Sequence, residues 1–118
     1  MQTNPVGTTW TLGNHALTDA EVAAGAPQRK PFYGEDDLPA DPDEVELQVT
    51  DPDRIVSFYR WPAAGPGDAG VLTKQETGRF YVYVTPQAGQ DGTWTWKLKG
   101  AMVLGTGASD RDAFYVGP

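Results

Sequence analysis

The amino-acid sequence predicts an all-β domain built as a sandwich or a barrel. Residues 44–118 contain short segments in which apolar and polar side chains alternate, and a period of two is typical of half-buried strands. Turn-forming segments separate them at intervals of roughly ten residues, as in sandwiches and barrels. The chain has 118 residues, 14 glycines and 10 prolines, so we expect one domain with a single core, many turns and little helix.

The regular part of the chain begins with a predicted hairpin. In the segment 44–50, valine and leucine alternate with polar residues. Pro52 follows Asp51 in the connection, which favours a type I turn. The segment 55–61 is rich in β-branched and aromatic residues and forms the second strand. Its aromatic residues divide into one expected in the core, Phe58, and two expected on the outer face, Tyr59 and Trp61.

Four more strands complete the predicted domain. A short strand is expected at 71–74, longer ones at 79–85 and 93–99, and a closing strand at 113–116. Gly100 marks a bulge, beyond which the third of these strands continues through residues 101–104. The residues expected in the core are Phe80, Val82, Val84, Trp94, Trp96, Leu98, Phe114 and Val116. The residues expected on the outer face of the 79–85 strand are Tyr81 and Tyr83.

Residues 1–40 are irregular and are expected to form an extended N-terminal arm, followed by the sandwich at 41–118. A first strand is expected near 8–12. A short helix is expected at 18–25, because a threonine at its start and a glutamate three residues later form a capping box and a glycine ends it. From residue 27 to 42 the chain is expected to be extended and polar.

The charge of the chain excludes several classes of partner. Nine basic and sixteen acidic residues give a net charge of −7, which repels nucleic-acid backbones and anionic lipid. No stretch has the roughly 20 apolar residues of a membrane helix. The first residues do not resemble a signal peptide, so we expect a protein that acts in the producing cell or in a particle assembled there.

The residues do not suggest a catalytic or metal site. The chain has no cysteine, and neither serine lies in a Gly-x-Ser-x-Gly motif. A single histidine without cysteine rarely forms a transition-metal site, and His15 is expected at the surface or at a strand edge. We therefore expect neither an enzyme nor a bound cofactor or metal.

An acidic segment spans residues 35–53 and contains no lysine or arginine. Clustered carboxylates on loops are typical of calcium sites, but the spacing is not that of an EF-hand loop. Turn chemistry and a solvated face explain the same residues, and we favour that interpretation over a calcium-dependent adhesion domain. The acids concerned are Glu35, Asp36, Asp37, Asp41, Asp43, Glu44, Glu46, Asp51 and Asp53.

Four segments of residues 41–118 carry a resemblance to a known family. Residues 41–53 contain Asp-Pro-x-x-Val-x-Leu-x-Val-x-Asp-Pro-Asp, and residues 77–84 read Thr-Gly-Arg-Phe-Tyr-Val-Tyr-Val. Residues 92–100 begin Gly-Thr-Trp, and residues 114–116 read Phe-Tyr-Val. Their order and spacing resemble those of small immunoglobulin-like structural proteins of tailed-bacteriophage virions. Arg54 departs from the family pattern, which has glycine at that turn position.

This resemblance implies an immunoglobulin-like β-sandwich without enzymatic activity. The implied location is the virion, assembled in the host cytoplasm, and the implied role is capsid decoration or cementing. A protein of the head–tail connector region is the first alternative. A carbohydrate- or cell-surface-binding module displayed on the particle is the second.

The expected partners are phage capsid or head–tail proteins, with a homo-oligomer also open. An extended arm binds neighbouring subunits by strand addition or wrapping, and exposed aromatic residues supply most of the contact energy. We assign arm contacts to Trp10, Phe32 and Tyr33. On the sandwich we assign contacts to Tyr81 and Tyr83, because an outward row of aromatics indicates a protein contact or, less favoured here, a sugar contact.

Overall fold

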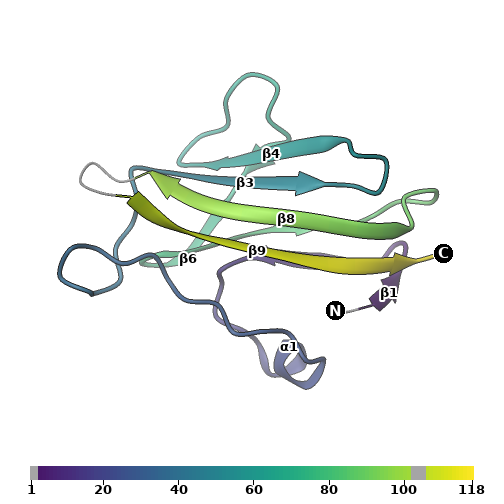
Figure 1. Ribbon diagram of the computed structural model, residues 1–118, viewed down its shortest axis with the longest axis horizontal. Coiled ribbons are helices and arrows are strands. Elements are labelled where there is room, and N and C mark those ends of the chain that lie inside the picture. Colours follow the sequence, from purple (N-terminus) through teal and green to yellow (C-terminus); the bar gives the residue numbers. More distant parts are fainter. Residues whose placement is uncertain (1–2, 102–105) are drawn as a thin grey trace.

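The computed structural model describes residues 3–101 and 106–118, with side chains in the second segment from residue 111 onward. It consists of two β-sheets packed face to face (Figure 1), which confirms the predicted all-β sandwich. The larger sheet contains, in order, β1 (Thr3–Pro5), β9 (Thr106–Gly117), β8 (Gly92–Ala101), β3 (Glu44–Thr50), β4 (Val56–Trp61) and β5 (Gly70–Val71). The smaller sheet contains β2 (Trp10–Gly13), β7 (Arg79–Val84) and β6 (Thr73–Glu76).

The core lies between the two sheets and is supplied by alternate residues of the strands. Burial of a large side chain of this kind contributes roughly 1.5–3 kcal/mol to folding. The aromatic rings pack in contact, with the centroids of Trp10 and Phe114 4.2 Å apart and those of Trp61 and Phe80 4.9 Å apart. The buried hydrophobic residues are Trp10, Leu12, Phe32, Val45, Leu47, Val49, Leu72, Phe80, Trp94, Trp96, Leu98, Phe114 and Val116.

The side chains of β4 point to the opposite faces of the sheet from those predicted. In its antiparallel register, Tyr59 pairs with Leu47 and Trp61 pairs with Val45, and directly opposed residues share a face. Tyr59 and Trp61 therefore pack against the core. Phe58 lies on the outer face, where the Arg60 guanidinium is 5.4 Å from its ring centroid.

A tight turn joins β3 to β4, and the predicted turn residues form it. The Asp51 side chain accepts hydrogen bonds from the backbone N–H groups of Asp53 and Ile55, both at 2.9 Å. Arg54 has φ of 66°, the left-handed region that favours glycine. This is the turn position at which the resembling family has glycine.

Leu72 alone connects the strands β5 and β6, which belong to different sheets. The predicted single strand at 71–74 is therefore divided between the two layers. The Leu72 side chain is buried, and its backbone N–H donates a hydrogen bond to the Arg60 carbonyl. Switching of a strand between sheets by such a bend is a known way to form a corner.

A bulge near Gly100 interrupts the pairing of β8 with β9, as predicted. A Cβ atom at Gly100 would lie 2.5 Å from Pro42 and 3.0 Å from Phe32, so only glycine fits this close approach. Of the predicted continuation at 101–104, only Ala101 lies within the described residues.

The N-terminal segment folds onto the sandwich and does not extend away from it, which corrects the expectation of an extended arm. The strand β2 confirms the strand expected near 8–12 and pairs with β7, and β1 pairs in parallel with β9. The helix α1 (Asp19–Ala23) has the predicted capping box between Thr18 and Glu21. The segment folds back because its apolar side chains fill the core and its polar groups bond to β7.

Candidate protein-binding face

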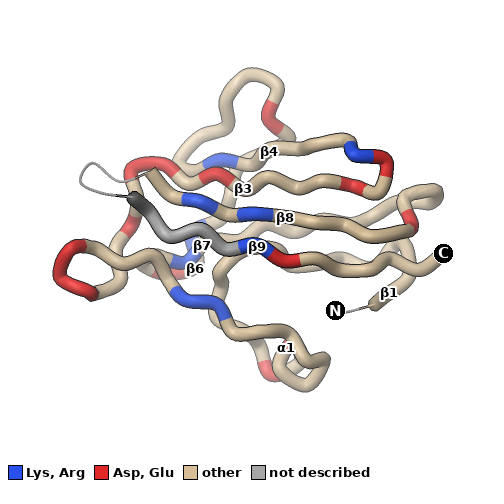
Figure 2. The backbone as a smooth tube through the Cα atoms, viewed as in Figure 1, with Lys and Arg blue, Asp and Glu red and all other residues tan. Residues whose placement is uncertain are grey.

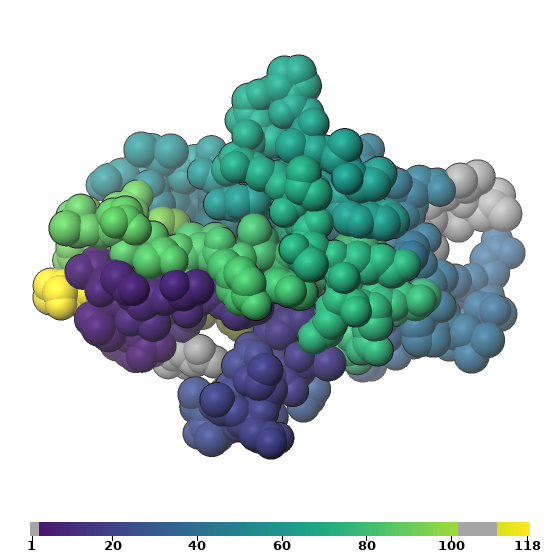
Figure 3. All heavy atoms as spheres, turned by 180° about the vertical axis from the view of Figure 1, so that it is seen from behind, coloured from purple at the N-terminus to yellow at the C-terminus, as the bar shows by residue number. Residues whose placement is uncertain are grey.

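The outer face of the smaller sheet has an uncharged part, which ends at the paired side chains of Arg79 and Glu76. Cross-strand register places Thr11 opposite Tyr83, and Gly13 and Thr73 on either side of Tyr81. At one end of this surface the hydroxyl groups of Thr9 and Thr85 are 2.8 Å apart and hydrogen-bonded. We call it the tyrosine–threonine face, and its residues are Thr9, Thr11, Gly13, Thr73, Tyr81, Tyr83 and Thr85. Figure 3 shows this side of the molecule, between the projecting loop 62–69 and α1.

Two tyrosines form the centre of the face. The rings of Tyr81 and Tyr83 meet edge to face with centroids 5.3 Å apart. Tyr83 is 62% exposed, whereas Tyr81 is half-buried. The neighbouring Tyr81 hydroxyl raises the pKa of Tyr83 above its ordinary value. A tyrosine hydroxyl is uncharged at neutral pH and can both donate and accept hydrogen bonds.

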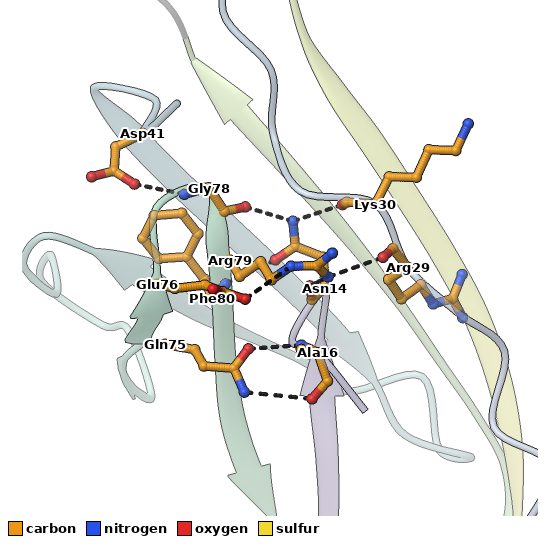
Figure 4. A network of polar contacts seen from close by, with 10 residues as sticks. All are labelled: Asn14, Ala16, Arg29, Lys30, Asp41, Gln75, Glu76, Gly78, Arg79 and Phe80. Carbon is orange, nitrogen blue, oxygen red and sulfur yellow. Dashed lines mark hydrogen bonds and ion pairs between the residues drawn. The ribbon is translucent and has the colours of Figure 1, made fainter. Parts of the chain in front are cut away.

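A buried polar network fixes the strand that carries both tyrosines (Figure 4). The Asn14 side chain accepts a hydrogen bond from the Phe80 N–H at 2.8 Å and donates to the carbonyls of Gly78 and Lys30. The Arg79 guanidinium donates to the carbonyls of Asn14 and Arg29. Buried polar groups that are fully paired specify one arrangement, so this network sets the position of β7.

The helix α1 borders the face and is attached to it by a hydrogen bond between two side chains. His15 Nε2 lies 2.6 Å from Glu21 Oε2, and the His15 and Tyr81 rings meet edge to face at 6.1 Å. Burial raises the pKa of Glu21, but the hydrogen bond with His15, that from the Thr18 N–H and the charge on His15 together lower it below its ordinary value. His15 is 6% exposed, so its expected surface position is wrong.

A cavity of about 440 Å³ lies between α1, β2 and β9. Its charged side chains form two pairs, His15 with Glu21 and Arg29 with Asp112. The Arg29 guanidinium also lies 4.9 Å from the Trp96 ring centroid. The Arg29–Asp112 pair attaches the N-terminal segment to β9. The sequence offered no signal for the Arg29–Asp112 pair, because its members are far apart in the chain.

The predicted contact residues fall into two groups. Trp10 and Phe32 are 6% and 2% exposed, so the expectation that they are surface contacts is wrong. Both are large apolar side chains, and the core between the sheets accommodates them. Tyr33, Tyr81 and Tyr83 do reach the surface, with Tyr33 in a separate loop. The structure thus brings together only the last two.

Five of the nine acids of the segment 35–53 have turn or ion-pair roles, among them Glu44, which pairs with Arg60. Asp36 and Asp51 accept backbone hydrogen bonds within their own turns, and Asp41 pairs with Lys74. Glu46 pairs with Arg60. Among the described side chains, those of residues 3–101 and 111–118, no group of three histidine or acidic residues is arranged to hold a metal ion.

Comparisons with protein-family models, curated proteins and solved structures found no match to the chain. Within the part of the chain that the structure describes, no helix has the length and apolar character needed to cross a membrane.

Proposed function

We propose that this chain is a non-enzymatic structural protein of a tailed-bacteriophage particle that decorates or cements the capsid. In this proposal it binds a capsid protein through the tyrosine–threonine face, not through an N-terminal arm. The observation that carries the proposal is this face itself, an uncharged surface centred on two tyrosines in a chain of net charge −7. Tyrosine is enriched in interface centres, and charged residues are depleted there.

The strand order supports the immunoglobulin-like fold that the resemblance implies. Variable-type immunoglobulin domains have strands A, B, E and D in one sheet and G, F, C, C′ and C″ in the other. Eight of the nine strands of the described residues follow this order, with β2, β7 and β6 in the first sheet and β9, β8, β3, β4 and β5 in the second. The remaining strand, β1, lies beside β9.

Binding to heads of the encoding phage, prepared without this protein, tests the proposal. We expect Tyr83→Ala to weaken binding by about tenfold, or ~1.4 kcal/mol, because truncation of an interface tyrosine commonly has an effect of this size. The matched control is Tyr115→Ala, a tyrosine 38% exposed on β9 of the opposite sheet, which should bind within about twofold of the unmodified protein.

Two results would contradict the proposal. Equal binding by the Tyr83→Ala and Tyr115→Ala variants would remove the tyrosine–threonine face from the interface. Failure of the unmodified protein to bind phage heads, together with Tyr83-dependent binding on a glycan array, would support the carbohydrate-binding alternative.

A further inference from the structure

The outer face of the larger sheet contains a second feature, a groove of about 490 Å³ over β3, β8 and β9. It lies on the opposite side of the molecule from the tyrosine–threonine face. Its outward side chains are Gln48, Thr50, Thr95, Lys97, Arg111 and Ala113. Its lining also includes Trp96 and Asp112, and the Asp112 carboxylate is paired with Arg29. We call this surface the basic groove.

Two cations face each other in the basic groove. Lys97 on β8 is the register partner of Arg111 on β9, and both side chains are exposed. Lys97 points outward because it lies between the buried residues Trp96 and Leu98. Figure 2 shows basic positions on β8 and β9 side by side in this sheet. Like charges directly opposite each other on neighbouring strands are destabilising.

Most other cations of the described residues are paired, whereas neither Lys97 nor Arg111 has an ion pair among those residues. On the same face, Glu46 lies 3.3 Å from Arg60 and 3.1 Å from Lys99, so its carboxylate is already engaged. The other paired cations are Arg29, Lys74 and Arg79. No carboxylate among the described side chains pairs with these two cations, so an acidic group of a partner can bind them.

The neighbours of the two cations are suited to a carboxylate. Gln48 is the register partner of Lys97, and Thr95 lies between Thr50 and Ala113. A guanidinium binds a carboxylate through two parallel hydrogen bonds, and amide and hydroxyl groups add further donors. The small Ala113 side chain leaves space beside Arg111.

We infer that the basic groove binds an acidic peptide segment of a partner protein, with its carboxylates placed between Lys97 and Arg111. A short acidic segment brings a few charges to a local basic site. A nucleic acid brings a dense row of phosphates, which suits an extended basic stripe and not a site of two cations. The inference does not depend on the proposed function, because it concerns the other sheet.

Titration of the full chain with a tetraglutamate peptide, acetylated and amidated at its ends, tests this inference by NMR. We expect saturable shifts of the backbone amides of Gln48, Lys97 and Arg111, and none with tetraglutamine. A Lys97→Gln/Arg111→Gln variant should bind roughly fivefold more weakly, the effect of two exposed ion pairs. Because it removes like-charge repulsion, this variant should have a Tm equal to or above that of the unmodified protein.

The matched control is Lys30→Gln/Arg54→Gln, which removes the same charge from two positions outside the groove. It should bind tetraglutamate as the unmodified protein does. If both double variants bound tetraglutamate equally weakly, net charge alone would explain the loss of affinity, and the inference would be overturned. Tighter binding of a thymidine pentanucleotide of the same charge would overturn it in favour of a phosphate site. Shifts of the groove amides with protein concentration alone would identify a second copy as the occupant.

Discussion

Arg54 holds a backbone conformation that costs free energy for any residue except glycine. Its φ of 66° completes the turn between β3 and β4, where its N–H donates to the Asp51 carbonyl at 3.0 Å. A side chain with a Cβ atom is strained in this region by roughly 1–2 kcal/mol. The strain is local, because the Asp51 side chain and backbone satisfy the turn on both sides.

We expect Arg54→Gly to stabilise the protein by up to about 1 kcal/mol, since relief of the left-handed strain exceeds the entropy that glycine loses on folding. The free energy of unfolding in urea measures this. The matched control is Asp53→Gly in the same turn, where φ is not positive and only the entropy loss remains, so that variant should be less stable. A destabilised Arg54→Gly variant would contradict the prediction.

At the scale of an element, α1 depends on polar contacts for its stability. It has five residues, none of them buried, and isolated helices of this length do not form in water. Glu21 stabilises α1 through two contacts, because it is the capping-box residue and also the partner of His15. The lowered pKa of Glu21 means that its ionised form stabilises the folded state.

The stabilisation from Glu21 is present above its ordinary pKa and is lost as the pH falls through the lower folded-state pKa. Asp41 acts in the same direction, because burial raises its pKa less than Lys74 and the Gly78 N–H lower it. Unfolding free energies between pH 7 and pH 3 should therefore decrease on the acid side. We expect a smaller decrease for Glu21→Gln.

Asp19→Asn is the matched control for this pH profile, because it removes an acid from the same helical turn without a described ion pair. It should keep the pH dependence of the unmodified protein. Identical profiles for Glu21→Gln and the unmodified protein would show that the His15 contact does not stabilise the fold.

At the scale of the whole molecule, Asn14 joins the N-terminal third of the chain to the smaller sheet. Its side chain makes three hydrogen bonds, to groups 16, 64 and 66 residues away in sequence. Removal of such a side chain leaves buried backbone groups without partners, at roughly 1–3 kcal/mol each before relaxation. The segment between β2 and β3 would then separate more easily from β7.

We expect Asn14→Ala to lower the free energy of unfolding by about 2 kcal/mol or more and to speed trypsin cleavage after Arg29. Denaturation and limited proteolysis measure the two effects. The control Asn4→Ala, at an exposed position of β1, should change neither. Unchanged proteolysis in the Asn14→Ala variant would mean that other contacts hold the segment.

Local patterns in the sequence predicted most strands, the capping box at Thr18 and the bulge near Gly100. These features depend on residues close together in the chain. The predicted orientation of the β4 side chains was wrong because Phe58, Tyr59 and Trp61 place aromatic side chains on both faces. Only the register with β3 decides between them, and register is a property of the pair of strands.

The prediction of an extended N-terminal arm was also wrong, because the path of this segment depends on contacts with residues distant in sequence. A run of turn-forming residues predicts a lack of regular structure but does not show where the chain goes. The position of Phe32 depends on Gly78 and Gly100, two distant glycines that leave space for it. Of the contact residues, alternation alone identified Tyr81 and Tyr83. The basic groove was missed because it requires the pairing of β8 with β9.

The passage of the chain from one sheet to the other at Leu72 has a mechanical consequence. A sliding force applied to one layer at this edge is transmitted to the other through covalent bonds of the main chain, before any side-chain contact in the interior has to yield. The two layers should therefore separate last at this edge, where a single residue joins β5 to β6.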